Sequence, residues 1–190
     1  MDEMLEKENR RLHLLHVCLR LFVRQGYEGT TTRDITREAD ISTGLLFHYF
    51  PTKSAVLDEI ARISCNGILP INRLLKSGQP PLILFETISQ RIFASFHDPF
   101  YTHLFLMANQ IKTIGSIPAS SKSILATYDN ISDSLPPIIQ GQHVGQIRKG
   151  NPNALALAFW GSIQGIAESV VWYPEIPIPD PDWVVDILRG

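Results

Sequence analysis

Residues 29–53 constrain the fold of the chain more than any other stretch. Their apolar residues recur at helical spacing in two short segments, Thr32–Ala39 and Thr43–Phe50, which a tight turn joins. Pro51 ends the second segment, because the residue before a proline is disfavoured in helical conformation. Two short helices across a turn, braced by flanking helices, are typical of a helix-turn-helix, whose second helix fits the major groove of DNA.

The residues at the ends of these two segments fit helix termini. Thr31 is expected to cap the first helix, with Asp34 three residues later, where a carboxylate accepts hydrogen bonds from free backbone N–H groups. Ser42 or Thr43 is expected to cap the second helix. Asp40 follows the first helix at a position that needs a positive φ, which Asp tolerates better than most residues.

Helical periodicity continues on both sides of this stretch, and no segment shows strand alternation. Residues 4–25 predict one long helix, which Gly26 ends in left-handed conformation. The helices expected after the helix-turn-helix cover residues 53–76, 81–97, 100–112, 119–140, 152–172 and 182–189. We therefore predict an all-α protein with an N-terminal three-helix helix-turn-helix domain, residues 1–53, and a larger C-terminal helical domain, residues 54–190.

Charge alone does not identify a nucleic-acid-binding protein here. The chain carries 17 Lys and Arg against 19 Asp and Glu, and residues 1–53 hold eight basic and eight acidic residues. A strongly basic domain would indicate nucleic acid by composition, so the case for DNA rests on the arrangement of residues. The apolar fraction of 44 % and the charged fraction of 19 % exclude a disordered chain.

Other classes of protein are disfavoured by what the sequence lacks. It has no run of about 18 apolar residues, so we expect no membrane-spanning segment, and its charged start predicts no secretory signal. Cys18 and Cys65 are too few for a disulfide framework or a zinc site, which fits a reducing cytoplasm. Because no hydrolase, nucleotide-binding or metalloprotease motif is present, we expect neither an enzyme nor a cofactor or metal site.

Residues 30–53 read TTTRDITREADISTGLLFHYFPTK. Without gaps, this stretch resembles the signature TT-x-R-D-I-A-x-x-A-G-V-S-K-G-x-L-Y-x-Y-F-x-S-K of the TetR family of bacterial transcriptional regulators. Four positions depart from it, since Thr36, Asp40, Thr43 and Phe47 stand where the family usually has Ala, Gly, Lys and Tyr. The resemblance implies that the domain binds double-stranded DNA.

The resemblance also implies which side chains meet DNA. Hydroxyl, backbone N–H and Lys groups at the helix starts are expected to contact phosphate, and Phe47 is expected to touch a thymine methyl group. A solvated or packing role is the alternative for Arg33, His48 and Tyr49. The residues expected to contact DNA are Thr32, Arg33, Ser42, Thr43, Gly44, Phe47, His48, Tyr49 and Lys53.

The resemblance further implies that the larger domain houses a small-molecule effector. Its helices combine large apolar residues with a few polar ones, as a ligand pocket does, although an ordinary helical core is the alternative. The expected pocket residues are Phe93, Phe96, His97, His103, Met107, Gln110, Tyr128, Trp160 and Gln164.

Residues 151–173 carry a pattern that favours helix pairing. Gly161 and Gly165 lie one turn apart, and each costs a helix about 1 kcal/mol relative to Ala, which favours a close approach by another helix. Packing within one subunit is the alternative, whereas the resemblance implies that the last two long helices form a homodimer. The expected interface residues are Phe159, Gly161, Gly165, Ile166, Ser169, Trp183 and Ile187.

Together these features predict a DNA-binding transcriptional repressor. It is expected to bind a near-palindromic operator as a homodimer and to be released by a small apolar or amphipathic effector. Two alternatives stay open: an enzyme acting on a lipophilic substrate in the same pocket, and a helical interaction module whose helix-turn-helix binds protein. No membrane partner is expected.

Overall fold

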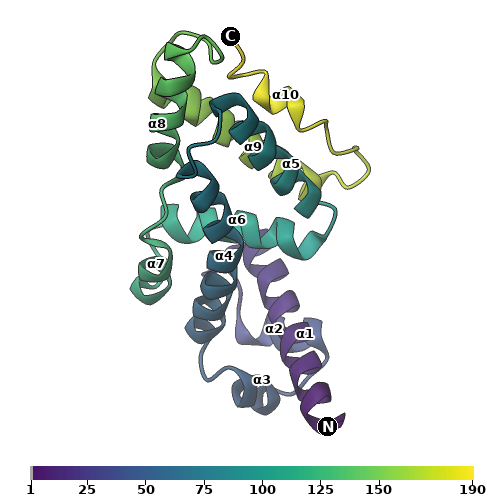
Figure 1. The fold of residues 1–190 in the computed structure, drawn as a ribbon. Helices are drawn as coiled ribbons and strands as arrows, with labels where there is room; N and C mark the ends of the chain where they lie inside the picture. Colours follow the sequence, from purple (N-terminus) through teal and green to yellow (C-terminus); the bar gives the residue numbers. More distant parts are fainter. Residues whose placement is uncertain (1) are drawn as a thin grey trace. The chain divides into compact units, whose positions relative to one another are not determined.

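The computed structural model describes residues 2–190, and the expected all-α fold is confirmed (Figure 1). Apart from one isolated β-bridge, the regular structure of these residues is helical. The described residues form ten helices: α1 (Asp2–Gln25), α2 (Thr32–Ala39), α3 (Thr43–Tyr49), α4 (Lys53–Leu75), α5 (Pro81–Ser95), α6 (Pro99–Thr113), α7 (Ala119–Leu125), α8 (Asn130–His143), α9 (Pro152–Trp172) and α10 (Asp182–Val185).

The chain divides into two compact units. The first consists of residues 1–65 and 103–126, and the second of residues 66–102 and 127–190. Helices α4 and α6 each supply residues to both units. A separate domain of residues 1–53 stays a prediction, and its expected boundary coincides with the first residue of α4.

In the core of the first unit α1 packs against α2, and α2 packs against α3. The largest fully buried side chains of this core include Leu15, Leu19, Phe22, Ile35, Leu57 and Ile60. Cys18 also lies in this core, and burial raises the pKa of its thiol to about 12. The thiol therefore stays protonated at neutral pH and serves as a packing group.

The single helix expected over residues 119–140 is wrong, because the chain breaks between α7 and α8. The carboxylate of Asp129 accepts hydrogen bonds from the backbone N–H groups of Ile131 (3.1 Å) and Ser132 (3.2 Å). This N-cap starts a second helix that continues through Pro136 and Pro137 to His143. The apolar periodicity runs across the break, which is why it concealed the two separate helices.

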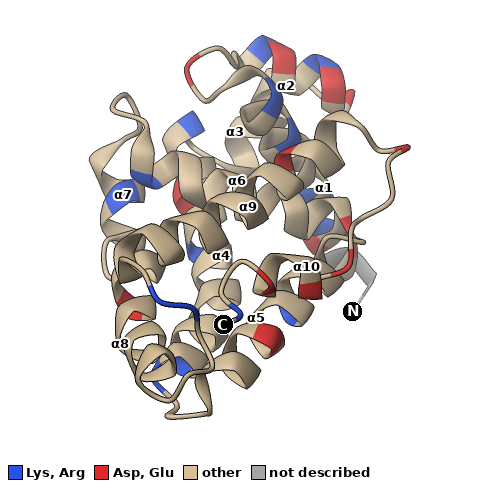
Figure 2. Cartoon of the chain, turned by 90° about the horizontal axis from the view of Figure 1, so that it is seen from above, with Lys and Arg blue, Asp and Glu red and all other residues tan. Residues whose placement is uncertain are grey.

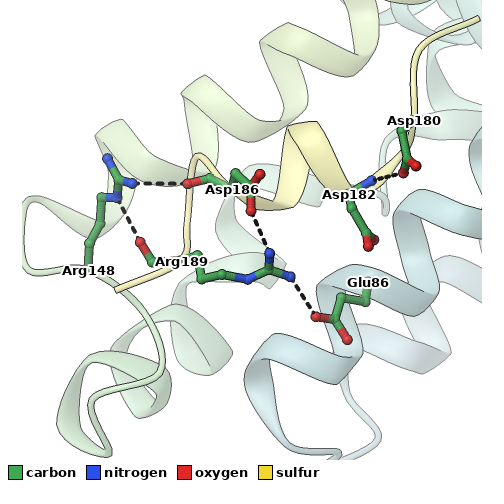
Figure 3. A network of polar contacts seen from close by, with 6 residues as sticks. All are labelled: Glu86, Arg148, Asp180, Asp182, Asp186 and Arg189. Atoms are coloured by element: carbon green, nitrogen blue, oxygen red, sulfur yellow. Dashed lines mark hydrogen bonds and ion pairs between the residues drawn. The ribbon is translucent and has the colours of Figure 1, made fainter.

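The helix expected over residues 182–189 is also shorter than predicted, since α10 ends at Val185. The residues after it continue as hydrogen-bonded turns and bond with the connection between α8 and α9. Arg148 donates from its backbone N–H to Leu188 O (2.8 Å) and from its guanidinium to the carbonyl oxygens of Asp186 (3.0 Å) and Arg189 (3.1 Å; Figure 3). Arg148 thus supplies these carbonyl oxygens with the N–H donors that a continued helix would otherwise provide.

Arg189 ties the same C-terminal segment to α5. Its guanidinium lies between the carboxylates of Asp186 (2.6 Å) and Glu86 (2.9 Å), as Figure 3 shows. The segment from 182 to 190 is therefore held by side chains of α5 and of the α8–α9 connection.

Aromatic side chains fill the core of the second unit, where α9 packs beside α8 and α5. Phe159 is fully buried and contacts the ring of Phe85 at 5.1 Å between ring centroids. The expectation that Phe159 forms part of an exposed interface is therefore wrong. It lies on the inner face of α9, opposite the exposed glycines, because it sits two residues from Gly161 and so about 200° around the helix.

Candidate nucleic-acid interface

A reciprocal pair of hydrogen bonds fixes the start of α2. Asp34 N donates to Thr31 Oγ1 (3.1 Å), and Thr31 N donates to a carboxylate oxygen of Asp34 (3.0 Å), which confirms the expected cap. These bonds from Thr31, with a smaller contribution from the cation of Arg37, hold the pKa of Asp34 below its ordinary value. Asp40 ends the helix with φ of 52°, as expected.

Helix α3 presents one face to the core and another to solvent. Ser42 is its N-cap, because its Oγ accepts a hydrogen bond from Leu45 N (3.2 Å), whereas Thr43 lies inside the helix. Leu46 and Phe50 are each only 2 % exposed and anchor the helix from behind. The side chain of Phe47, by contrast, is 43 % exposed.

The outer face of α3 gathers most of the residues that the sequence predicted for DNA contact. Thr43, Gly44 and His48 are exposed beside Phe47, and the His48 ring meets the half-buried Tyr49 ring edge-on at 5.4 Å. This surface offers a hydroxyl, free backbone N–H groups, an apolar ring and an imidazole. Such groups can contact phosphate oxygens and base edges.

Helix α2 carries charges of both signs, which Figure 2 shows as blue and red segments. Arg37 is paired with Asp34 at 2.8 Å, and Glu38 is paired with Arg20 at 2.7 Å. Arg33 is exposed and takes part in no ion pair recorded among residues 2–190. Its guanidinium is therefore available to an external anion, and Thr32 lies half-buried beside it.

Lys53 does not lie on an open surface, where we would expect a residue that contacts phosphate. Its Nζ donates hydrogen bonds to the carbonyl oxygens of Tyr27 (2.8 Å) and Thr30 (3.0 Å), and it lies 4.2 Å from the centroid of the Tyr27 ring. Tyr27 was not predicted as a partner of Lys53. Tyr27 and Lys53 are 26 residues apart, so no local spacing pattern connects them.

The expected pocket residues fall into both units. His103 and Met107 are buried and Gln110 is half-buried in the first unit, whereas the other six belong to the second. In the second unit Phe93 and His97 line an open, solvent-facing cavity of about 340 Å³ between α5 and the proline-rich segment before α10. The rest of its lining was not predicted from the sequence and consists of Gln90, Ala94, Ile178, Pro179, Asp180 and Pro181.

Phe96 and Trp160 do not line this cavity and lie buried in the second unit. The Trp160 indole donates a hydrogen bond to Ser134 Oγ at 2.9 Å. Tyr128 and Gln164 are half-buried there. These four residues therefore fit the alternative of a helical core at least as well as a pocket.

Apart from the buried Phe159, the expected interface residues of α9 lie on one largely exposed face. Gly161, Gly165 and Ser169 are exposed, Ile166 is half-buried, and a Cβ added at either glycine meets nothing within 4 Å. Two further exposed apolar residues that the sequence analysis missed extend this face, since helical spacing places them near the glycines. They are Leu157 (60 % exposed) and Trp172 (56 % exposed).

The other two expected interface residues lie outside α9. Trp183 is 67 % exposed on α10, and Ile187 is half-buried beyond the end of that helix. Among the described residues, α9 is also the one helix long and apolar enough to cross a membrane, by length and composition alone. This property of α9 was not predicted from the sequence, because α9 contains no unbroken run of apolar residues.

The arrangement of α1 to α4 defines a helix-turn-helix protein. A family model described as bacterial regulatory proteins of the tetR family matches residues 14–60, from within α1 to within α4. The expected resemblance to the tetR family is therefore confirmed over residues 14–60.

Curated relatives match this chain to different extents. The HTH-type transcriptional repressor KstR2 of Rhodococcus jostii (strain RHA1) is 41 % identical over 61 residues, which make up 32 % of this chain and 30 % of that repressor. The HTH-type transcriptional regulator AcrR of Shigella flexneri is 24 % identical over 178 residues, or 90 % of this chain and 82 % of AcrR. The stronger identity is thus confined to less than a third of KstR2.

A solved structure shares the fold over nearly the whole chain. AibR, in complex with isovaleryl coenzyme A and operator DNA, superposes with a TM-score of 0.67 and 15 % identity, covering 93 % of this chain and 94 % of AibR. At this identity the likeness establishes the fold, which is an N-terminal helix-turn-helix followed by a larger helical region.

Proposed function

We propose that the protein is a transcriptional repressor that binds double-stranded DNA through α3. The outer face of this helix carries the proposal, because Thr43, Gly44, Phe47 and His48 are exposed while Leu46 is buried. A helix with this arrangement can enter a major groove and leave the core behind it intact. Sequence similarity to the repressor KstR2 and the regulator AcrR supports the same function.

The proposed contacts separate into those that position the protein and those that read sequence. Thr32, Arg33, Ser42 and Thr43 lie at or beside helix starts, where hydroxyl, guanidinium and free N–H groups bind phosphate oxygens. On α3, the Phe47 ring meets a thymine methyl group, while the other polar side chains reach base edges or the backbone. The base contacts would determine which operator sequence the protein recognises.

Operator binding is proposed to need two copies of the chain. The exposed face of α9, with Leu157, Gly161, Gly165 and Trp172, is an apolar surface that a twin helix can cover. A two-fold dimer places its recognition helices about 34–36 Å apart, in successive major grooves of a near-palindromic site. This interface would also remove the exposed apolar residues of α9 from water. As a DNA-binding regulator, the protein is proposed to be cytoplasmic.

The effector is proposed to be a small, largely apolar molecule. The cavity of about 340 Å³ in the second unit lies within the range of ligand pockets, and it combines the apolar Phe93 and Ile178 with the polar His97 and Asp180. AibR, which shares the fold, was solved with both isovaleryl coenzyme A and operator DNA. Release from DNA requires that the effector bind the DNA-free conformation more tightly than the DNA-bound one.

Selection of bound sites from random duplex DNA tests this proposal. We expect a near-palindromic consensus whose affinity falls steeply with salt, because phosphate contacts release counterions. Compounds that stabilise the protein against heat should then be screened for release of the selected duplex. Duplexes with no enriched sequence, bound no better than a scrambled control at low salt, would refute the proposal and favour a protein-binding module.

The same compounds separate a regulator from an enzyme. A regulator is expected to release DNA and return each compound unchanged, whereas an enzyme would convert it. Mass spectrometry of a compound after prolonged incubation with the protein distinguishes the two outcomes.

A further inference from the structure

Two ends of the helix-turn-helix meet at one ammonium group. Tyr27 and Thr30 lie in the turn that leads into α2, and Lys53 is the first residue of α4. Lys53 Nζ donates to Tyr27 O at 2.8 Å and to Thr30 O at 3.0 Å. One side chain therefore closes a loop that contains all of α2 and α3.

The surroundings of Lys53 leave little of its ammonium group for an external partner. An ammonium has three N–H donors, and two of them are directed to backbone carbonyls. The face of the Tyr27 ring lies 4.2 Å away and stabilises the cation by its quadrupole. The Lys53 side chain is accordingly half-buried, unlike the exposed Arg33.

The turn that Lys53 contacts is itself rigid. Tyr27 is 8 % exposed and packs edge-on against Phe22 at 5.3 Å. Thr30 is fully buried, and its Oγ1 donates to Gly26 O at 2.8 Å. Because Thr31, the N-cap of α2, follows directly, any displacement of this turn moves the start of α2.

We propose that Lys53 is a positioning residue for DNA binding, which acts by clamping the α1–α2 turn to the start of α4 and not by pairing with a phosphate. The inference rests on the proposed DNA-binding function. With the clamp in place, α2 and α3 are held at both ends, and the outer face of α3 has a fixed orientation. Without it, the helices keep their own caps but lose their common anchor.

Lys53→Met tests this role, since Met fills similar space without donating hydrogen bonds. We expect the variant to bind the selected duplex about tenfold more weakly, with an unchanged slope of log affinity against log salt. A phosphate ligand would instead lower that slope by about 0.9, because one fewer counterion is released. Arg33→Met is the matched control, in which an exposed cation is lost and the slope should fall.

Tyr27→Leu provides a second test, because a phosphate contact by Lys53 predicts no effect of this substitution on DNA affinity. The ring of Tyr27 is buried and contacts Phe22 and Lys53, so its loss should affect DNA binding only by loosening the clamped turn. We expect the double variant, Tyr27→Leu with Lys53→Met, to bind no more weakly than Lys53→Met alone. Additive losses from the two substitutions would overturn the proposal.

Lys53→Arg decides the matter if Lys53→Met does not fold. Arg binds phosphate at least as well as Lys, so a phosphate role predicts undiminished affinity. The positioning role predicts weaker binding, because a planar guanidinium directs its N–H donors differently and would not reproduce the ammonium's bonds to the two carbonyls. If the unsubstituted protein shows no preferred duplex, the proposed function fails and this inference fails with it; if only the Lys53 results disagree, the inference alone is wrong.

Discussion

The indole Nε1 of Trp160 on α9 donates a hydrogen bond to the Oγ of Ser134 on α8, across 2.9 Å in the buried space between the two helices. Ser134 in turn donates to Asn130 O at 2.6 Å. This chain of bonds satisfies the indole N–H and fixes the packing of α8 against α9, the helix proposed to carry the dimer interface.

Ser134→Ala should destabilise the folded protein by about 1–3 kcal/mol, because it leaves the buried N–H of Trp160 without an acceptor. Urea unfolding followed by tryptophan fluorescence measures the change in free energy. Ser116→Ala, at an exposed serine, is the control and should alter stability by less than about 0.5 kcal/mol. Equal effects of the two substitutions would show that the Trp160 bond contributes nothing.

The Thr31–Asp34 cap predicts that the free energy of unfolding depends on pH in the acid range. Because the pKa of Asp34 is lowered in the folded state, its charged form stabilises the fold above the unfolded-state pKa of about 3.9. This contribution is lost as the pH falls through the lower folded-state pKa. Asp34→Asn should therefore flatten the acid limb of the unfolding free energy measured against pH.

Asp40→Asn is the matched control for that titration. Asp40 is an exposed carboxylate of the same helix-turn-helix, and Asn tolerates its φ of 52°. In the Asp40→Asn control, the unfolding free energy should fall more steeply with acid than in Asp34→Asn. If both variants follow the unsubstituted protein below pH 4, the cap has no role in acid stability.

Gly44→Ala separates DNA contact from folding. A Cβ at Gly44 meets only Ser42 Oγ at 3.9 Å, so the free protein should keep its stability or gain up to about 1 kcal/mol. Close approach of DNA to the start of α3 should make the same Cβ weaken binding about tenfold or more, or about 1.4 kcal/mol. Fluorescence anisotropy with the selected duplex measures this affinity.

The control for Gly44 is another helical glycine with open space around it. Gly67 lies exposed in α4, and a Cβ there meets nothing within 4 Å. Gly67→Ala should resemble Gly44→Ala in stability and the unsubstituted protein in DNA affinity. Undiminished binding by Gly44→Ala would move the DNA contact away from the start of α3.

Gly161→Leu and Gly165→Leu should weaken the dimer. Both positions have open space within one chain, so a larger side chain is tolerated by the monomer and obstructs only the approach of a second helix. Light scattering at a series of protein concentrations should show dissociation at concentrations where Gly67→Leu remains dimeric. A dimer that persists in both α9 variants would place the interface elsewhere.

The helix-turn-helix could be predicted almost residue by residue because its signals are local. The N-cap at Thr31, the positive φ at Asp40 and the end of α3 before Pro51 each depend on residues within four positions. The break between α7 and α8 was missed because apolar periodicity continues through it and the N-cap at Asp129 was the only local sign.

Features that depend on distant parts of the chain could not be predicted from spacing. The end of α10 follows from bonds to Arg148, some forty residues earlier in the sequence. The burial of Phe159 depends on Phe85, and the engagement of Lys53 depends on Tyr27. In each case the sequence specified the residue type, but tertiary packing decided which way the side chain faces.

The central claim is that two copies of α3 bind successive major grooves of one operator. The most direct test is the affinity for the selected duplex before and after insertion of five base pairs between its half-sites. Because the insertion turns one half-site by about half a helical turn, we predict that tight binding is lost, and that a ten-base-pair insertion partly restores it. Equal affinity for all three duplexes would contradict the account.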